Sequence, residues 1–160
     1  MISMFRIGFG FDTHKLVADK KLMLGGVHIP YHLGCEGHSD ADVLIHAICD
    51  ALLGASNLRD IGYHFPDTDI RYKDKESSFF LKEICKIIAK KQWKIGNIDT
   101  TIVIQQPKIS PYIVPIQESL SAILQIEADC ISIKAKTSEN LGFIGRQEGV
   151  SAYAVALLTK

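Results

Sequence analysis

The stretch SDADVLIHAICDALLG, residues 39–54, decides how this chain folds. Ser39 suits the N-cap of a helix, and Asp42, three residues later, suits the acidic partner of a capping box. The helix is expected to run to about Leu53 and to end at Gly54, because glycine commonly terminates helices. Its apolar face has six residues at helical spacing: Val43, Leu44, Ala47, Ile48, Ala51 and Leu52. The other face carries Asp42, His46 and Asp50 at intervals of four residues.

Hydrophobic patterns on both sides of this helix predict a sheet and two further helices. Strands are expected at residues 5–11, 22–24, 27–29, 99–105, 131–136 and 150–158. Gly25-Gly26 predicts a hairpin between the second and third of these strands. The run 150–158 is so continuously apolar that a buried helix would also explain it, but a strand is favoured because little chain remains.

The further helices are expected to begin at Ser77 or Ser78, and at Ser110-Pro111 with an end near Ile126. Residues 56–75 and 137–148 are polar and predict loops, and the glycines at positions 8 and 10 predict a close approach to the first strand. Together the elements predict a single α+β domain over residues 1–160, with a mixed β-sheet and helices packed on one face.

Composition excludes some classes of function. Eighteen basic residues balance eighteen acidic ones, which argues against a nucleic-acid or membrane-surface protein but leaves room for a local cationic pocket. The first six residues lack the layout of a signal peptide, and no apolar run is long enough to span a bilayer, so a cytoplasmic location is expected. The four cysteines form no C-x-x-C motif and are expected to be free thiols.

The motif Asp12-Thr13-His14 predicts a metal site. On an extended segment Asp12 and His14 point to the same side, because strand side chains alternate. One carboxylate and two imidazoles suit Zn²⁺, and three protein ligands leave an open position, as in catalytic sites. Either His38 or His46 could be the third ligand, and spacing alone leaves that choice open. Asp42, one turn before His46, could also bind metal, although helix capping explains it equally well.

Several motifs resemble the 2-C-methyl-D-erythritol 2,4-cyclodiphosphate synthase family. The resemblance covers nearly the whole chain, at residues 6–14, 25–30, 39–47, 60–62, 65–69, 106–108, 134–139 and 141–146. It implies a step of the non-mevalonate isoprenoid pathway on 4-diphosphocytidyl-2-C-methyl-D-erythritol 2-phosphate. The substrate's own 2-phosphate would attack the β-phosphorus, releasing CMP and the cyclic diphosphate. It also implies a homotrimer with active sites at the subunit interfaces.

The same resemblance implies roles for individual residues. Asp12, His14 and His46 would bind one zinc ion per subunit, which decides the third ligand in favour of His46. His38 and Thr137 would stabilise the transition state, and Glu139 would bind a second cation, Mg²⁺ or Mn²⁺, with the substrate diphosphate. No protein nucleophile is needed, because the substrate brings its own.

Substrate contacts are also implied, in three groups. The phosphates and the methylerythritol would contact Asp12, His14, His38, Ser39, Asp60, Ile61, Gly62, Phe65, Pro66, Asp67, Thr68 and Asp69. The cytosine pocket would be lined by Ile104, Gln105, Gln106, Pro107, Lys108, Ile109 and Ser110. The diphosphate and neighbouring groups would contact Lys136, Thr137, Ser138, Glu139, Phe143 and Arg146.

Plainer interpretations stand beside these. Residues 137–139 could merely satisfy a turn, Arg146 could be a surface ion-pair partner, and Lys136 could point away from the phosphates. His64 lies in a segment where the family pattern fixes no residue, and it could bind metal adventitiously. For the whole chain, the rivals are a metal-dependent phosphohydrolase and a non-catalytic trimer that binds a prenyl diphosphate.

Overall fold

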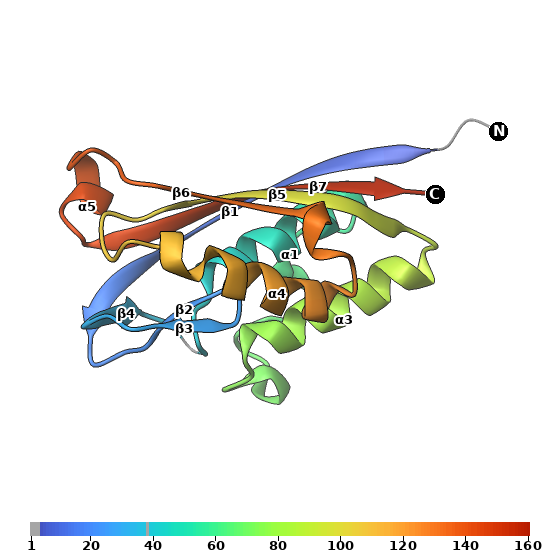
Figure 1. Ribbon diagram of the computed structural model, residues 1–160. Helices are drawn as coiled ribbons and strands as arrows, with labels where there is room; N and C mark the ends of the chain where they lie inside the picture. The colour runs from blue at the N-terminus through green and yellow to red at the C-terminus, as the bar shows by residue number, and fades with distance from the viewer. Residues whose placement is uncertain (1–3, 38) are drawn as a thin grey trace.

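A five-stranded mixed sheet forms one layer of the fold, and helices form the other (Figure 1). The computed structural model describes residues 4–37 and 39–160. The strands in the sheet are β1 (Phe5–Ala18), β4 (Leu33–Cys35), β5 (Lys94–Val103), β6 (Ile131–Lys136) and β7 (Gly149–Thr159). Their order is β4-β1-β7-β5-β6, with β5 and β6 parallel and the other neighbours antiparallel. The run at 150–158 is therefore a strand, central in the sheet as expected.

The three long helices pack on one face of this sheet, as predicted, and the short last helix lies at one end of it (Figure 1). They are α1 (Val43–Ala55), α2 (Ile61–His64), α3 (Ser77–Lys90), α4 (Ile113–Leu124) and α5 (Gly142–Gly145). Short 3-10 turns occur as η1 (Ile70–Tyr72), η2 (Ser110–Tyr112) and η3 (Ala128–Cys130). A separate hairpin, β2 (Leu22–Leu24) with β3 (Val27–Ile29), is the one predicted through Gly25-Gly26.

The start of α1 differs from the prediction. Asp42, not Ser39, is the N-cap, and its carboxylate accepts the Ile45 N–H at 3.1 Å. The same carboxylate accepts the N–H groups of Gly25 and Gly26 at 2.9 and 2.7 Å. Asp42 is fully buried, so it does not lie on the open face of the helix. Helix capping, rather than metal binding, is what occupies this side chain.

Helix α1 is buried on nearly all sides. Within it only His46, Asp50 and Gly54 escape full burial, and they form one stripe at intervals of four residues. The helix packs on β1, β7 and α3. A Cβ at Gly8 would lie 1.9 Å from the Ala51 carbonyl oxygen, and one at Gly10 would lie 1.9 Å from that of Ala47. The predicted close approach to the first strand is therefore made by the backbone of α1.

Several boundaries shift for identifiable reasons. The two predicted loops contain α2, η1 and α5, which are too short to leave a hydrophobic period. Glu76 precedes α3, and Ser77 is its buried first residue rather than its cap, because the Ser77 hydroxyl bonds to side chains outside the helix. Ser110 opens a 3-10 turn that leads into α4 instead of capping it. The strand expected at 99–105 begins at Lys94, because residues 94–98 pair with the end of β7.

The face of the sheet away from the helices is apolar and exposed. Its exposed large residues are Phe5, Ile7, Phe9, Phe11, Tyr153 and Val155, with exposed fractions of 38% to 67%. They come from the paired strands β1 and β7, where Phe9 faces Val155 and Phe11 faces Tyr153. Within residues 4–37 and 39–160, no helix is long and apolar enough to cross a bilayer. All four cysteines are free thiols, as expected.

Candidate metal centre

Strand β1 sets the direction of the two predicted ligands. Gly8 and Gly10 face the helices and are buried, and Asp12 and His14 continue this alternation along the strand. Because α1 lies directly against Gly10 through the Ala47 backbone, its neighbour His46 is carried to the level of Asp12. The close glycine contact thus brings the strand motif and the helix histidine together.

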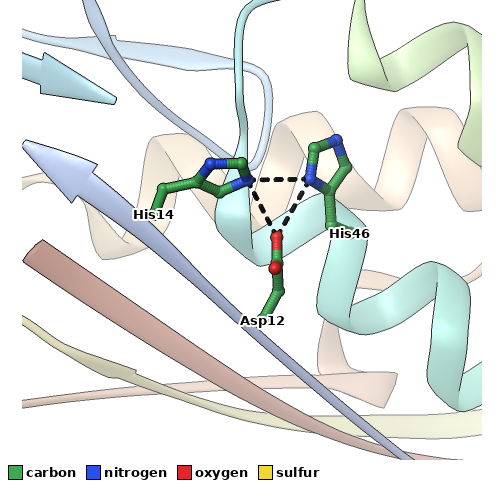
Figure 2. A group of neighbouring side chains, drawn as sticks. All are labelled: Asp12, His14 and His46. Atoms are coloured by element: carbon green, nitrogen blue, oxygen red, sulfur yellow. Dashed lines mark hydrogen bonds and ion pairs between the residues drawn. The ribbon is translucent and has the colours of Figure 1, made fainter. Parts of the chain in front are cut away.

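The three side chains converge on a single point (Figure 2). The Asp12 Oδ2 atom lies 3.0 Å from His14 Nε2 and 3.0 Å from His46 Nδ1. The two histidine nitrogens lie 3.2 Å apart. The side chains keep 19% to 28% of their exposure, so one side of the cluster is open to solvent. His46 is the third member of this cluster, and His38, the alternative that spacing left open, lies outside the described residues.

This donor set fits a zinc ion. Zinc bonds of about 2.0–2.1 Å in tetrahedral geometry put ligand atoms about 3.3 Å apart, close to the separations found in the cluster. One carboxylate oxygen and two imidazole nitrogens are ordinary zinc ligands. Among the described residues, Asp12, His14 and His46 are the group of histidine, cysteine and acidic side chains that could hold a metal ion.

His14 is oriented by the backbone. Its Nδ1 lies 3.0 Å from the Glu36 carbonyl oxygen, and an acceptor there requires Nδ1 to carry the proton. The Nε2 lone pair is then free for a metal. Hydrogen bonds of this kind to the outer nitrogen are the usual means by which proteins orient a ligating histidine.

His46 is held by side chains instead. Its Nε2 lies 2.9 Å from the Ser77 hydroxyl, which is in turn in short contact with the Asp40 carboxylate. The Ser77 N–H also donates to Asp40, at 3.1 Å. Neither Asp40 nor Ser77 was identified as a functional residue from the sequence. They lie 37 residues apart, and no local pattern joins them.

Asp12 and His14 of β1 shift each other's pKa. Burial acts to raise the pKa of Asp12, but hydrogen bonds with His14 and His46 outweigh it and lower the pKa well below 3.8. Burial acts to lower the pKa of His14, but the hydrogen bond to Asp12 outweighs it and raises the pKa above 6.5. Burial raises the pKa of nearby Cys35 to about 12, so this cysteine stays a neutral thiol and is no nucleophile.

A cavity of about 520 Å³ opens beside the cluster. Of the predicted site residues, it is lined by His14, Ser39, His46, Ile61, Gly62, Phe65, Asp67 and Thr68. Its other lining residues are Gly37, Ala41, Ile70, Tyr72, Lys73, Asp74 and Phe80, which sequence reasoning missed. Four of the seven, at positions 70, 72, 73 and 74, directly follow the Phe65 to Asp69 segment, so the loop's continuation was the available signal.

A second group of predicted residues lies elsewhere, at the end of β5 and β6. The Ile104 N–H donates to the Lys136 carbonyl at 3.0 Å, and the Asn140 N–H donates to the Gln105 side chain at 3.2 Å. The Thr137 hydroxyl donates to Glu139 at 2.9 Å. None of these residues lines the cavity beside His14 and His46. The described chain therefore contains two separate groups of predicted contacts.

Other predicted residues have local partners. Asp60 caps α2 by accepting the Tyr63 N–H, and Asp69 caps η1 and pairs with Arg71. Arg146 pairs with Glu148 at the surface. The His64 ring bonds to the Leu58 carbonyl at 2.7 Å, which gives it a structural partner. His38 lies outside the described residues, so its expected contact with phosphate stays a prediction.

The chain is similar to known proteins over nearly its whole length. The family model described as the YgbB family matches residues 5–159. A protein of Cytophaga hutchinsonii named 2-C-methyl-D-erythritol 2,4-cyclodiphosphate synthase is 53% identical over 155 residues, covering 97% of this chain and 98% of that protein. One of the same name from Porphyromonas gingivalis strain W83 is 55% identical over 154 residues, covering 96% and 95%.

Its fold is similar to that of solved structures. A CDP-bound 2C-methyl-D-erythritol-2,4-cyclodiphosphate synthase superposes with a TM-score of 0.89 at 38% identity, covering 96% of this chain and 99% of that one. The CDP complex of the Plasmodium falciparum protein superposes with a TM-score of 0.85 at 39% identity, covering 96% and 95%. With relatives more than half identical aligned from end to end, the chain belongs to the YgbB family, and its resemblance to the cyclodiphosphate synthases is confirmed.

Proposed function

We propose that this protein converts 4-diphosphocytidyl-2-C-methyl-D-erythritol 2-phosphate to 2-C-methyl-D-erythritol 2,4-cyclodiphosphate and CMP, as a phosphorus–oxygen lyase of the non-mevalonate pathway. The observation that carries the proposal is the convergence of Asp12, His14 and His46 beside a cavity lined by residues of the family motifs at 39–47, 60–62 and 65–69. Relatives that bear the synthase name share more than half of the sequence.

The reaction is an intramolecular phosphoryl transfer. An oxygen of the substrate's 2-phosphate forms a bond to the β-phosphorus, and the bond from that phosphorus to the bridging oxygen breaks. CMP leaves with the bridging oxygen and its electron pair. Such a reaction asks the protein for positioning and for neutralisation of charge, more than for a covalent partner.

The ligand cluster is suited to one zinc ion per subunit. A zinc ion there would act as a Lewis acid toward a phosphate oxygen, since one Asp and two neutral histidines leave the site net positive. Asp12, His14 and His46 would hold the ion, and the two histidines line the cavity. Glu139 is proposed to bind the second cation, Mg²⁺ or Mn²⁺, together with the diphosphate.

The two groups of contact residues have different tasks in this proposal. Ser39, Ile61, Gly62 and the Phe65 to Asp69 segment hold the methylerythritol and its phosphate beside the metal centre, and Asp60 starts this wall by capping α2. Residues 104–110 hold the cytosine, Lys136 to Glu139 hold the diphosphate, and His38 and Thr137 stabilise the transition state. Phe143 and Arg146 complete the substrate contacts.

We propose that the protein is a homotrimer, with each active site between two subunits. The exposed apolar face of β1 and β7 supports this, because a patch that includes Phe5, Ile7 and Phe9 is unusual for a surface that meets only water. The separation of the two contact groups in one chain supports it too, since a neighbouring subunit would bring one group to the other. A cytoplasmic location, where thiols stay reduced, suits the free cysteines.

An assay of CMP release tests the proposal. The purified protein is given the substrate with Zn²⁺ and Mg²⁺, and the His46→Ala variant is compared with His28→Ala, a variant at an exposed histidine on the hairpin. Wild type and His28→Ala should release CMP at similar rates, and His46→Ala should be slower by about 100-fold or more because it loses a metal ligand. Release by His46→Ala at the wild-type rate, or no release by wild type, would show the proposal to be wrong.

A further inference from the structure

The outer side of His46 is bonded to a chain of two further side chains. His46 Nε2 lies 2.9 Å from Ser77 Oγ, and Ser77 Oγ is in short contact with Asp40 Oδ1. Ser77 is fully buried, so no bulk water competes for its hydroxyl. The three residues come from three places in the fold: α1, the first position of α3, and the segment that leads into α1.

The acceptor at the end of this series of hydrogen bonds, Asp40, determines which group donates each proton. An ionised carboxylate accepts only, so the Ser77 hydroxyl donates its single proton to Asp40. The hydroxyl oxygen is then left to accept, and His46 Nε2 must supply the proton. A neutral imidazole protonated at Nε2 has its lone pair on Nδ1, the atom that faces Asp12 and His14.

We infer that Asp40 and Ser77 are positioning residues of the metal centre, which fix the tautomer and the ring orientation of His46 so that Nδ1 is presented to the metal. The inference rests on the proposed metal centre and extends it by two residues that do not touch the ion. The Glu36 carbonyl orients His14 in the same way, by accepting a hydrogen bond from its Nδ1. The two histidines therefore present opposite nitrogens, Nε2 and Nδ1, because their outer partners differ.

The same hydrogen bonds connect the metal centre to the cavity wall. Ser77 comes directly after the segment 56–76, which supplies much of the lining of the cavity. Its N–H and hydroxyl tie the end of that segment to Asp40 and His46. The beginning of the segment is tied to α1 as well, where Asp50 accepts the Ile61 N–H at 2.8 Å. The Ser77 hydroxyl thus joins the end of the cavity-lining segment to His46, one of the proposed metal ligands.

Zinc affinity tests the inference directly. The metal-free protein is titrated with Zn²⁺ against a chromophoric chelator, for wild type, Ser77→Ala, Asp40→Asn and the double variant. Ser78→Ala is the matched control, since its hydroxyl sits one residue further in the same helix turn, with only a 3.5 Å contact to Glu76. Circular dichroism and urea unfolding establish that each variant is folded.

Loss of a partner to the outer nitrogen of a metal-bound histidine typically weakens binding by about 10–100-fold, and we expect that for Ser77→Ala. Asp40→Asn should also weaken zinc binding. The double variant should bind zinc as tightly as Ser77→Ala alone does, because Asp40 acts through the Ser77 hydroxyl. Ser78→Ala should stay within about twofold of wild type. In zinc-loaded wild type, the imidazole proton of His46 should give a slowly exchanging NMR signal that exchanges faster in Asp40→Asn.

The outcomes separate this inference from the proposed function. If wild type binds zinc and folded Ser77→Ala binds it equally well, the positioning role is overturned and the metal centre stands. If wild type binds no zinc, both are overturned. If Ser77→Ala does not fold, the zinc affinity of Asp40→Asn and the exchange rate of the His46 imidazole proton in wild type test the inference. A rapidly exchanging proton in wild type would contradict the hydrogen bonds from His46 to Ser77 and Asp40.

Discussion

A proton and a metal ion compete for the same atoms in the Asp12, His14 and His46 cluster. Hydrogen bonds to the histidines lower the pKa of Asp12, so its stabilising effect is present above its ordinary pKa of 3.8 and is lost as pH falls through the lower folded value. The pKa of His14 is raised, so its effect is present below 6.5 and is lost as pH rises through the folded value. In the protein without zinc, the interaction between Asp12 and His14 therefore stabilises the fold fully between the two ordinary pKa values, 3.8 and 6.5.

Zinc binding to the cluster should become stronger as pH rises. Binding requires a neutral His14, so the increase in melting temperature caused by zinc should be larger at pH 8 than at pH 5.5. Thermal unfolding with and without Zn²⁺ at both pH values measures this, and Asp12→Asn should remove most of the increase. An increase that is equal at the two pH values would contradict this assignment of ligands.

Sequence could predict those site residues whose spacing has a local geometric consequence. Asp12 and His14 share a face because strand side chains alternate, and the structure has them there. Spacing could not choose His46, which depends on how α1 packs on β1. It missed Ser77 and Asp40 because their contacts span 31 and 37 residues, and only the folded chain brings them together.

At the scale of elements, the contact between β1 and α1 brings His46 to Asp12 and so forms the cluster of possible metal ligands. Replacing Gly10 with alanine would put a Cβ 1.9 Å from the Ala47 carbonyl oxygen, so helix and strand would have to separate. We expect Gly10→Ala to lower the free energy of unfolding by about 3 kcal/mol or more, and to weaken zinc binding because His46 moves away from Asp12. Urea unfolding and chelator competition measure the two effects.

Gly54→Ala is the matched control for this contact. A Cβ there would meet only the Phe9 carbonyl oxygen at 3.9 Å, an ordinary contact. Alanine is the better helix former, by about 0.8–1.0 kcal/mol, so Gly54→Ala should leave stability unchanged or raise it. Equal losses in the two variants would mean that the close approach at Gly10 does not set the packing.

The buried cap Asp42 joins α1 to the β2–β3 hairpin. Its carboxylate accepts three backbone N–H groups, from Gly25, Gly26 and Ile45. Asp42→Ala would leave them without that partner, and a loss of about 2–4 kcal/mol is expected in urea unfolding. Asp60→Ala, at the cap of the exposed helix α2, should cost about 1 kcal/mol or less. If Asp42→Ala cost no more than Asp60→Ala, the hairpin would not depend on this cap.

The existence of the long, periodic elements was predictable, and most of the ends of the longer strands and helices were not. Strand β6 matches its prediction at both ends, and α1 was found from its apolar pattern. The start of α1 was placed too early, because Ser39 and Asp42 both suit a cap by residue type. Only tertiary contacts with Gly25 and Gly26 show why Asp42 has that role.

At the scale of the whole molecule, the apolar outer face of the sheet is expected to be the subunit contact. Phe9 is 63% exposed and lies beside Tyr153, with ring centroids 6.4 Å apart. Phe9→Glu would put a charge into this face, and sedimentation should then show monomers in place of trimers. Val114→Glu makes the same change at another exposed apolar residue, on α4, and should leave the trimer intact. A trimeric Phe9→Glu protein would rule out this face as the contact.

The central claim is a ring closure in which the substrate supplies the nucleophile. Its most direct test is phosphorus NMR of the products that the enzyme forms in ¹⁸O-enriched water, with both Zn²⁺ and Mg²⁺ present. Ring closure predicts the cyclic diphosphate and CMP with no ¹⁸O isotope shift on either, because no water oxygen enters. A linear phosphate product carrying ¹⁸O would show that water is the nucleophile, and would make the protein a phosphohydrolase instead.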